Sequence, residues 1–131
     1  MEDQGGFGIE LTSGQRRVAG HGPGPMLVVG PAGSGRSEAL AARFAGLVAT
    51  GTAPARIMVL TRSRAASTRL RERTSALIEL PYEELWISTY EVIAERLLRE
   101  HALEAGLDPF FATVRAADRL AMLLDLSLIH I

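Results

Sequence analysis

The sequence predicts an α/β fold in which helices flank a parallel sheet, and three observations support this fold class. Short apolar runs recur at residues 26–29, 57–60 and 85–88, as is typical of strands buried on both faces. Longer segments with helical patterning separate these runs, and strands joined by helices pair in parallel through right-handed crossovers. The 131 residues give room for one domain of ordinary size.

The chain is predicted to begin with a flexible lead-in and a short helix. Residues 1–10 include three glycines and are expected to be flexible. Residues 11–19 favour a helix with Thr12 or Ser13 as the candidate N-cap, because a hydroxyl accepts hydrogen bonds from the first free amides. The segment 21–25 contains two glycines and two prolines, so it is predicted to form a loop.

A strand, a turn, a helix and a second strand are predicted to follow. The apolar run 26–29 leads into the glycine-rich turn 30–35, and an alanine- and leucine-rich helix is expected over residues 37–49. The run 57–60 then provides the second strand. Two such strands joined by one helix form a βαβ unit.

Three further helices are predicted in the rest of the chain. The first spans residues 64–80 and is ended by Pro81. The run 85–88 is the third candidate strand, and an amphipathic helix is expected over residues 91–105. The last predicted helix spans residues 115–124.

The composition excludes several classes of protein. No apolar run approaches the roughly 18 residues that a membrane-spanning helix needs, and Met1 is followed by two acidic residues rather than by a secretory signal. Cysteine is absent, which excludes disulfides and thiolate chemistry. All 14 basic residues are arginine, and the absence of lysine and asparagine indicates a GC-rich, bacterial genome. We expect a cytoplasmic protein, and the net charge of −1 gives it no global attraction to nucleic acid.

Residues 30–37 match the phosphate-loop pattern of two glycines, a basic residue and a hydroxyl, except that arginine replaces the usual lysine. Glycines let consecutive backbone N–H groups face phosphate oxygens, and the following helix adds its positive end. The basic residue neutralises the β and γ phosphates, and the hydroxyl binds Mg²⁺. The predicted ATP site comprises Gly30, Pro31, Ala32, Gly33, Ser34, Gly35, Arg36 and Ser37, with Ser37 as the Mg²⁺ ligand.

Arg36 is expected to affect hydrolysis more than binding. Lysine is a compact point charge on a slim stem, whereas arginine is a wide planar fork. Arginine still pairs with phosphate, but its width is expected to crowd the loop and displace the γ-phosphate. We therefore hypothesise that nucleotide binding is retained while ATP turnover is weakened or altered.

Several segments, taken in order, resemble motifs of superfamily 1 DNA helicases of the UvrD/PcrA/Rep type. Residues 11–15, Leu-Thr-Ser-Gly-Gln, resemble the Q motif of this family, and residues 30–35 resemble its first motif. Residues 57–61, Ile-Met-Val-Leu-Thr, resemble the next motif, and residues 87–90, Ile-Ser-Thr-Tyr, resemble its Thr-Phe-His segment. The resemblance covers residues 11–124 in the order and spacing of the family.

The resemblance implies a RecA-like P-loop NTPase fold that is truncated in this chain. Residues 11–112 would form part of the ATP-binding domain, and residues 113–125 would begin an inserted helical subdomain. The implied parent is an ATP-dependent helicase or translocase that acts on single-stranded DNA or duplex–single-strand junctions in bacterial repair or recombination, at the nucleoid. Gln15 is implied to contact adenine, since an amide both donates to and accepts from its edge.

The resemblance also implies DNA contacts near the ends of two strands. Open α/β sheets bind ligands at the carboxyl ends of their strands, and single strands are held by basic and aromatic side chains. The implied contact residues are Thr61, Arg62, Arg64, Thr89 and Tyr90.

The arginines within the predicted helix 64–80 are interpreted differently. Arg69, Arg71 and Arg73 are predicted to form a solvated face of that helix. Glu72 and Glu79 would partly neutralise this face.

Some positions depart from the family's pattern. Glu38 and Glu91 stand where the family often has arginine and histidine, and the loop 61–64 is one residue short and lacks the usual phenylalanine. No apolar strand ends in the Asp-Glu pair that a motor ATPase needs. The chain is therefore expected to hold no catalytic residue and to be inactive by itself.

Two alternatives remain open. A different phosphate-loop enzyme, such as a kinase, would also use residues 30–37, although the Q-like motif and the segment from Thr89 argue against it. A degenerate nucleotide-sensing or scaffold module of a helicase-like complex is the second, and Arg36 is the residue that favours it.

We interpret the last six residues as encoded by a sequencing adapter rather than by the natural gene. Residues 126–131, Leu-Ser-Leu-Ile-His-Ile, are the in-frame translation of the sequencing-transposon adapter CTGTCTCTTATACACATC. We expect them to be an artefact, with the natural protein continuing past Asp125. Alternatively, they complete the last helix or begin a strand.

Overall fold

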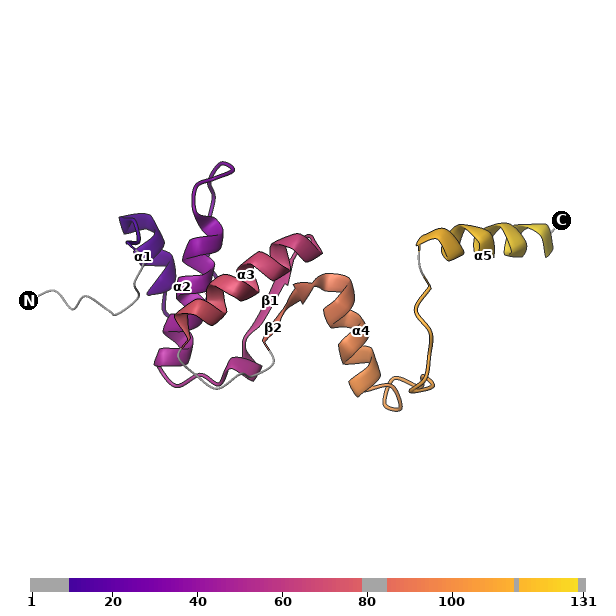
Figure 1. Cartoon of the computed structure of the whole chain (residues 1–131). Coiled ribbons are helices and arrows are strands. Elements are labelled where there is room, and N and C mark those ends of the chain that lie inside the picture. Colours follow the sequence, from indigo (N-terminus) through magenta and orange to yellow (C-terminus); the bar gives the residue numbers. More distant parts are fainter. Residues whose placement is uncertain (1–9, 79–84, 115, 130–131) are drawn as a thin grey trace, which may run out of the picture. The chain divides into compact units, whose positions relative to one another are not determined.

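A computed structural model describes residues 10–78, 85–114 and 116–129 (Figure 1). The chain divides into two compact units, Met1–Tyr90 and Glu91–Ile131. The first unit holds the predicted phosphate loop, residues 30–37, and the sheet, so it determines where the candidate site lies.

Helix α1 (Ser13–Ala19) begins at a complete capping box. The backbone N–H of Gln15 donates to the Thr12 hydroxyl over 3.3 Å, and the backbone N–H of Thr12 donates to Oε1 of Gln15 over 2.7 Å. Such a box satisfies two amides that a helix start leaves free and stabilises it by about 1 kcal/mol. The predicted helix and its predicted N-cap Thr12 are confirmed.

Helix α2 (Arg36–Ala49) packs against α1 and is followed by the short 3₁₀ helix η1 (Pro54–Arg56). Arg43 on α2 donates from Nη1 to two carbonyls at the end of α1, that of Val18 over 3.3 Å and that of His21 over 2.5 Å. One guanidinium therefore joins α2 to the last turn of α1 and to the residue that follows its C-cap, and so holds α1 on α2.

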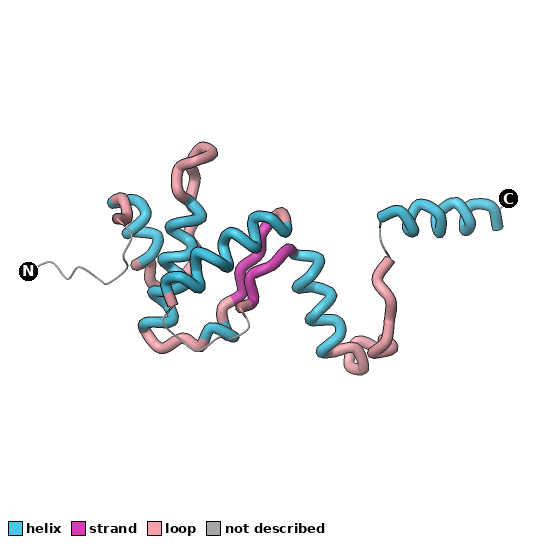
Figure 2. The backbone as a smooth tube through the Cα atoms, in the orientation of Figure 1, coloured by secondary structure: helices cyan, strands magenta, loops and turns pink. Residues whose placement is uncertain are grey.

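The sheet consists of strands β1 (Met58–Thr61) and β2 (Trp86–Thr89), which pair in parallel (Figure 2). Helix α3 (Arg64–Leu77) lies between them in the chain and packs against both. Its N-cap Ser63 accepts a hydrogen bond from the backbone N–H of Ala66 over 3.2 Å. The second and third predicted strands are confirmed within one residue, and they form the parallel pair that the sequence predicts.

The core of the first unit joins the sheet to two helices. Ala41 and Phe44 of α2, Leu70 of α3, Val59 of β1 and Ile87 of β2 form one buried cluster. Val59 and Ile87 lie opposite each other in the strand register, so they share one face of the sheet. Both helices therefore bury their apolar stripes against the same face.

The expectation that the strands are buried on both faces is wrong for β1 in the described residues. Val59 is buried, but Met58 and Leu60 on either side of it are exposed. Successive side chains of a strand point to opposite faces, and the buried cluster gathers on the face that holds Val59.

The predicted first strand, residues 26–29, does not form. Leu27 and Val29 are 88% and 84% exposed, and Met26 and Val28 are 41% and 40% exposed. The connection from α1 to α2 is loop throughout (Figure 2), and the described sheet contains two strands rather than three. A strand needs a neighbour for its backbone N–H and C=O groups, and neither β1 nor β2 pairs with this segment.

The end of α3 differs from its prediction. The helix ends at Leu77, and Ile78 has extended backbone angles of φ −108° and ψ 109°. Residues 79–80, which the prediction included in this helix, lie outside the described residues.

Helix α4 (Tyr90–Glu100), which belongs to the second unit from Glu91 onward, is shorter than predicted, and α5 (Ala116–Ile129) in the same unit is longer than predicted. Turns replace the last part of the helix predicted to residue 105, and Gly106 there has φ 69°. The helix predicted to end at residue 124 continues to Ile129, while its predicted first residue, Arg115, lies outside the described residues. The artefactual origin of residues 126–131 stays a prediction.

Helix α4 carries two ion pairs, each between side chains four residues apart. Arg96 pairs with Glu100 over 2.9 Å, and Arg99 pairs with Glu95 over 2.8 Å. Pairs at this spacing support a helix by a few tenths of a kcal/mol, about 0.3–0.5 each. Within the described residues, every helix is too short or too polar to cross a membrane.

Candidate functional site

The predicted phosphate loop has glycines at positions where the backbone requires them. Gly33 and Gly35 have φ of 79° and 76°, in the left-handed region that favours glycine. The backbone N–H of Ser34 donates to the carbonyl of Pro31 over 3.3 Å, which closes a turn inside the loop. A Cβ added to Gly30 would lie 2.7 Å from the Ser34 hydroxyl. The loop conformation therefore depends on the glycines that define the motif.

The N-terminus of α2 has no side-chain cap. Its N-cap is Gly35, which has no side chain to accept a hydrogen bond, whereas α1 and α3 are capped by the side chains of Thr12 and Ser63. Arg36 and Ser37 occupy the first turn of α2 and are exposed. Free amides, a cation and a hydroxyl at one helix start fit the phosphates of a nucleotide and its Mg²⁺. The residues present are therefore compatible with the predicted ATP site.

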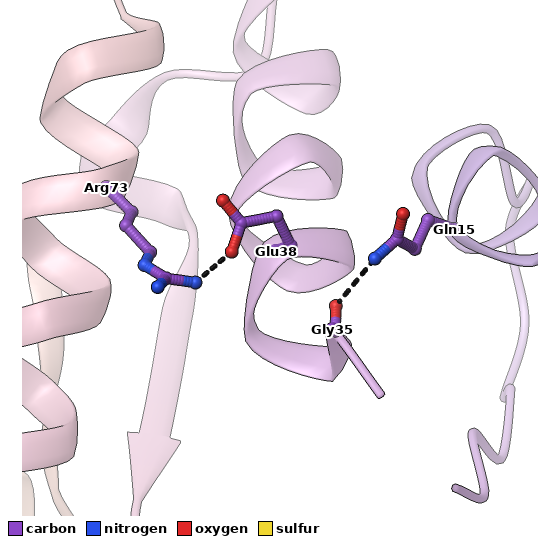
Figure 3. A network of polar contacts seen from close by, with 4 residues as sticks. All are labelled: Gln15, Gly35, Glu38 and Arg73. Carbon is purple, nitrogen blue, oxygen red and sulfur yellow. Dashed lines mark hydrogen bonds and ion pairs between the residues drawn. The ribbon is translucent and has the colours of Figure 1, made fainter. Parts of the chain in front are cut away.

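Gln15 lies against the phosphate loop. Its Oε1 accepts from the backbone of Thr12, and its Nε2 donates to the carbonyl of Gly35 over 3.3 Å (Figure 3). A Cβ added to Gly35 would overlap Nε2 of Gln15. The structure therefore brings the Q-like motif and the phosphate loop together, and the absence of a side chain at Gly35 permits the contact.

Glu38 and Arg73 form an ion pair between α2 and α3 (Figure 3). Glu38 lies in the first turn of α2, directly after Ser37. Its side chain is 26% exposed, and that of Arg73 is 47% exposed. The pair therefore places a neutralised carboxylate beside the residues predicted to bind phosphate and Mg²⁺.

The threonines predicted to contact DNA lie together at the ends of the two strands. Thr61 and Thr89 are register partners at the carboxyl ends of β1 and β2. The Thr61 hydroxyl lies 2.6 Å from the Ser67 hydroxyl and donates to the carbonyl of Ser63 over 3.1 Å. Thr89 is buried. In the described residues, the Thr61 side chain is therefore hydrogen-bonded to protein groups, and the Thr89 side chain lies in the protein interior.

The other predicted DNA contacts are exposed. Arg62 and Arg64 flank Ser63, the N-cap of α3, and Tyr90 follows β2 directly. The first two residues continue from β1 and the third from β2, so the parallel pairing brings all three to one end of the sheet. Their exposure leaves them accessible to a ligand.

Arg69, Arg71 and Arg73 are all exposed, as predicted for a solvated face of α3, but two of them also have partners that were not predicted. Nη2 of Arg71 donates to the carbonyl of Ile87 in β2 over 2.8 Å, and Arg73 pairs with Glu38. The partner of Arg73 comes from α2, which the sequence separates from it by 35 residues.

Sequence reasoning missed two contacts that shape the site. It did not assign a partner to Glu38, and it did not connect Arg43 with the end of α1. A carboxylate in the first turn beside the predicted phosphate loop was the available signal for the first contact, because it would repel a bound phosphate unless a cation neutralised it. Nothing in the sequence distinguished Arg43 from the other arginines.

A family model describing the UvrD/REP helicase N-terminal domain matches residues 11–129. The match includes the Q-like motif, the phosphate loop and both strands. It also includes residues 126–129 at the end of α5.

Several relatives are similar over most of this chain. DNA helicase II of Salmonella typhimurium is 31% identical over 114 residues, which are 86% of this chain and 16% of the relative. ATP-dependent DNA helicase PcrA of Bacillus subtilis is 31% identical over 76% of this chain and 14% of the relative. ATP-dependent DNA helicase UvrD1 of Mycobacterium tuberculosis is 34% identical over 82% of this chain and 14% of the relative. The chain thus spans about one sixth of the length of these relatives.

Proposed function

Because the chain belongs to the UvrD/REP helicase family, we propose that it is the N-terminal ATP-binding portion of an ATP-dependent DNA helicase or translocase. The family match over residues 11–129 is the observation that carries this proposal. Two of the relatives described above are named ATP-dependent DNA helicases. A match to helicases does not favour the alternatives of a kinase or a sensor module.

In this proposal, residues 30–37 hold the phosphates of ATP. The positive φ of Gly33 and Gly35 and the uncapped start of α2 support this role. Arg36 counters the phosphate charge, and Gln15, which already reaches Gly35, contacts adenine. The RecA-like arrangement is part of the same proposal.

Ser37 is proposed to hold Mg²⁺ together with the nucleotide. The ion supplies charge neutralisation at the β and γ phosphates when it is bound. Ser37 is exposed in the first turn of α2, so its hydroxyl is available to a ligand.

Single-stranded DNA is the proposed macromolecular partner, in repair or recombination in the bacterial cytoplasm. Arg62, Arg64 and Tyr90 are exposed at the carboxyl end of the sheet, which suits backbone pairing and base stacking. Thr61 and Thr89 would stabilise this end of the sheet through contacts within the protein. The carboxylates that activate water are proposed to lie outside this chain, since neither described strand ends in an Asp-Glu pair.

The test compares Arg36→Lys with Arg36→Ala in the full-length protein encoded by the gene. We expect Arg36→Lys to raise DNA-stimulated ATP hydrolysis, because a slim cation fits the loop better, and Arg36→Ala to weaken Mg-ATP binding. Arg56→Ala, an exposed arginine on η1, is the matched control and should change neither. No gain with lysine and no loss with alanine would contradict the role given to Arg36.

A further inference from the structure

The ion pair between Glu38 and Arg73 lies beside the candidate phosphate site and is not explained by the proposed function. Glu38 is one residue beyond Ser37 in the first turn of α2. A carboxylate at a helix N-terminus is favoured by the helix dipole, but it occupies the same electropositive region that a phosphate would use. By itself, Glu38 would repel a polyphosphate.

Arg73 removes this repulsion. Figure 3 shows the Glu38 side chain directed toward Arg73 on α3, while Gln15 approaches Gly35 from α1. The guanidinium cancels the negative charge and holds the carboxylate toward α3. Because the two side chains are 26% and 47% exposed, solvent screens the pair only in part.

We propose that Arg73 is a positioning residue for the nucleotide, which acts by neutralising Glu38 at the start of α2. This inference rests on the proposed ATP site and goes beyond it, because it assigns part of the electrostatics of nucleotide binding to a residue of α3. Arg73 contacts no reacting group. Arg73 affects nucleotide binding only by neutralising the charge of Glu38.

A purely structural role for the pair makes a different prediction. An exposed ion pair that only joins two helices contributes little to folding, and the effect of losing it would not depend on the charge of a ligand. Neutralisation of Glu38 instead makes the effect of Arg73 grow with the number of phosphates. The charge series of ATP, ADP and adenosine therefore separates the two roles.

The experiment measures dissociation constants of Mg-ATP, Mg-ADP and adenosine for the full-length protein at low salt. We expect Arg73→Ala to weaken Mg-ATP binding by roughly three- to tenfold, Mg-ADP binding by less, and adenosine binding by less than about twofold. Arg73→Lys should restore binding to within about twofold of the wild type, because it keeps the charge. The double variant Arg73→Ala with Glu38→Gln should also recover, because no unpaired carboxylate remains.

Three results would overturn the inference: unchanged Mg-ATP binding in Arg73→Ala, an equal loss for all three ligands, or no recovery in the double variant. If Arg73→Ala does not fold, Glu38→Gln carries the test, since it leaves a net positive charge and should tighten Mg-ATP binding. Weaker binding in Glu38→Gln would contradict the proposal. A wild-type protein that binds no nucleotide would refute the proposed function itself, which is a distinct outcome.

Discussion

The side-chain amide of Gln15 donates a hydrogen bond to the backbone carbonyl of Gly35 over 3.3 Å, and so joins α1 to the phosphate loop. The same side chain closes the capping box of α1 through its Oε1. Gln15 therefore links the start of one helix with the start of the next. A ligand that engages this amide would act on the position of α1 and on the loop together.

Replacement of Gln15 by alanine should affect both α1 and nucleotide binding. The variant loses half of the capping box, about 1 kcal/mol, and the contact with Gly35. We expect hydrogen exchange of the amides in α1 to accelerate by roughly fivefold and ATP binding to weaken by roughly three- to tenfold. Hydrogen-exchange mass spectrometry and calorimetric titration measure the two effects.

Thr12→Ala is the matched control for Gln15→Ala. It removes the other half of the capping box but leaves the hydrogen bond from Gln15 to Gly35. It should accelerate exchange in α1 by a similar factor and leave ATP binding within about twofold. Equal losses of ATP binding in both variants would mean that Gln15 acts only through the cap.

Alanine at Gly35 should be more damaging than alanine at Gly33. Both positions have positive φ, at a cost of about 1–2 kcal/mol for a residue with a Cβ. A Cβ at Gly35 would also overlap Nε2 of Gln15, whereas a Cβ at Gly33 would meet nothing within 4 Å. Thermal unfolding should therefore show a larger loss for Gly35→Ala.

The clash can be separated from the backbone strain by a double variant. Gln15→Ala removes the group that a Cβ at Gly35 would meet, so it should reduce the additional destabilisation caused by Gly35→Ala. It should leave the cost of Gly33→Ala unchanged. If the two glycine variants respond alike to Gln15→Ala, the contact between Gln15 and Gly35 does not determine the need for glycine.

Arg43→Ala should loosen the end of α1 without altering its start. The guanidinium donates to the carbonyls of Val18 and His21, and its loss leaves both without this donor. We expect a destabilisation of about 1–2 kcal/mol, measured as faster hydrogen exchange in residues 18–21. Arg17→Ala, at an exposed position of α1, should change exchange there by much less. A similar effect in both variants would contradict the role of Arg43.

Local sequence signals predicted most of the elements correctly. The Thr12 cap depends on a residue three positions away, so the local sequence specifies it. The runs that became β1 and β2 were identified from their apolar composition, although each strand also needs the other as its partner. Residues 26–29 show where this approach fails. Their apolar composition matches a strand, but a strand also requires a paired neighbour, and the sequence of a segment does not say whether one is present.

Part of the candidate site was predictable from local sequence, and part of it was not. The phosphate loop is a continuous motif whose glycines have the backbone angles that the motif requires. The pairing of Glu38 with Arg73 joins residues 35 positions apart and depends on how α2 packs against α3. The helical pattern of α3 identified Arg73 as a surface residue but could not identify its partner.

The most direct test of this account is calorimetric titration of the full-length protein with ATP, with and without Mg²⁺, beside the Ser37→Ala variant. We predict uptake of one nucleotide that depends on Mg²⁺, and we expect Ser37→Ala to lose most of that dependence because the ion loses its hydroxyl ligand. No nucleotide uptake by the wild-type protein, or uptake that neither Mg²⁺ nor Ser37 affects, would contradict the assignment of residues 30–37 as a nucleotide site.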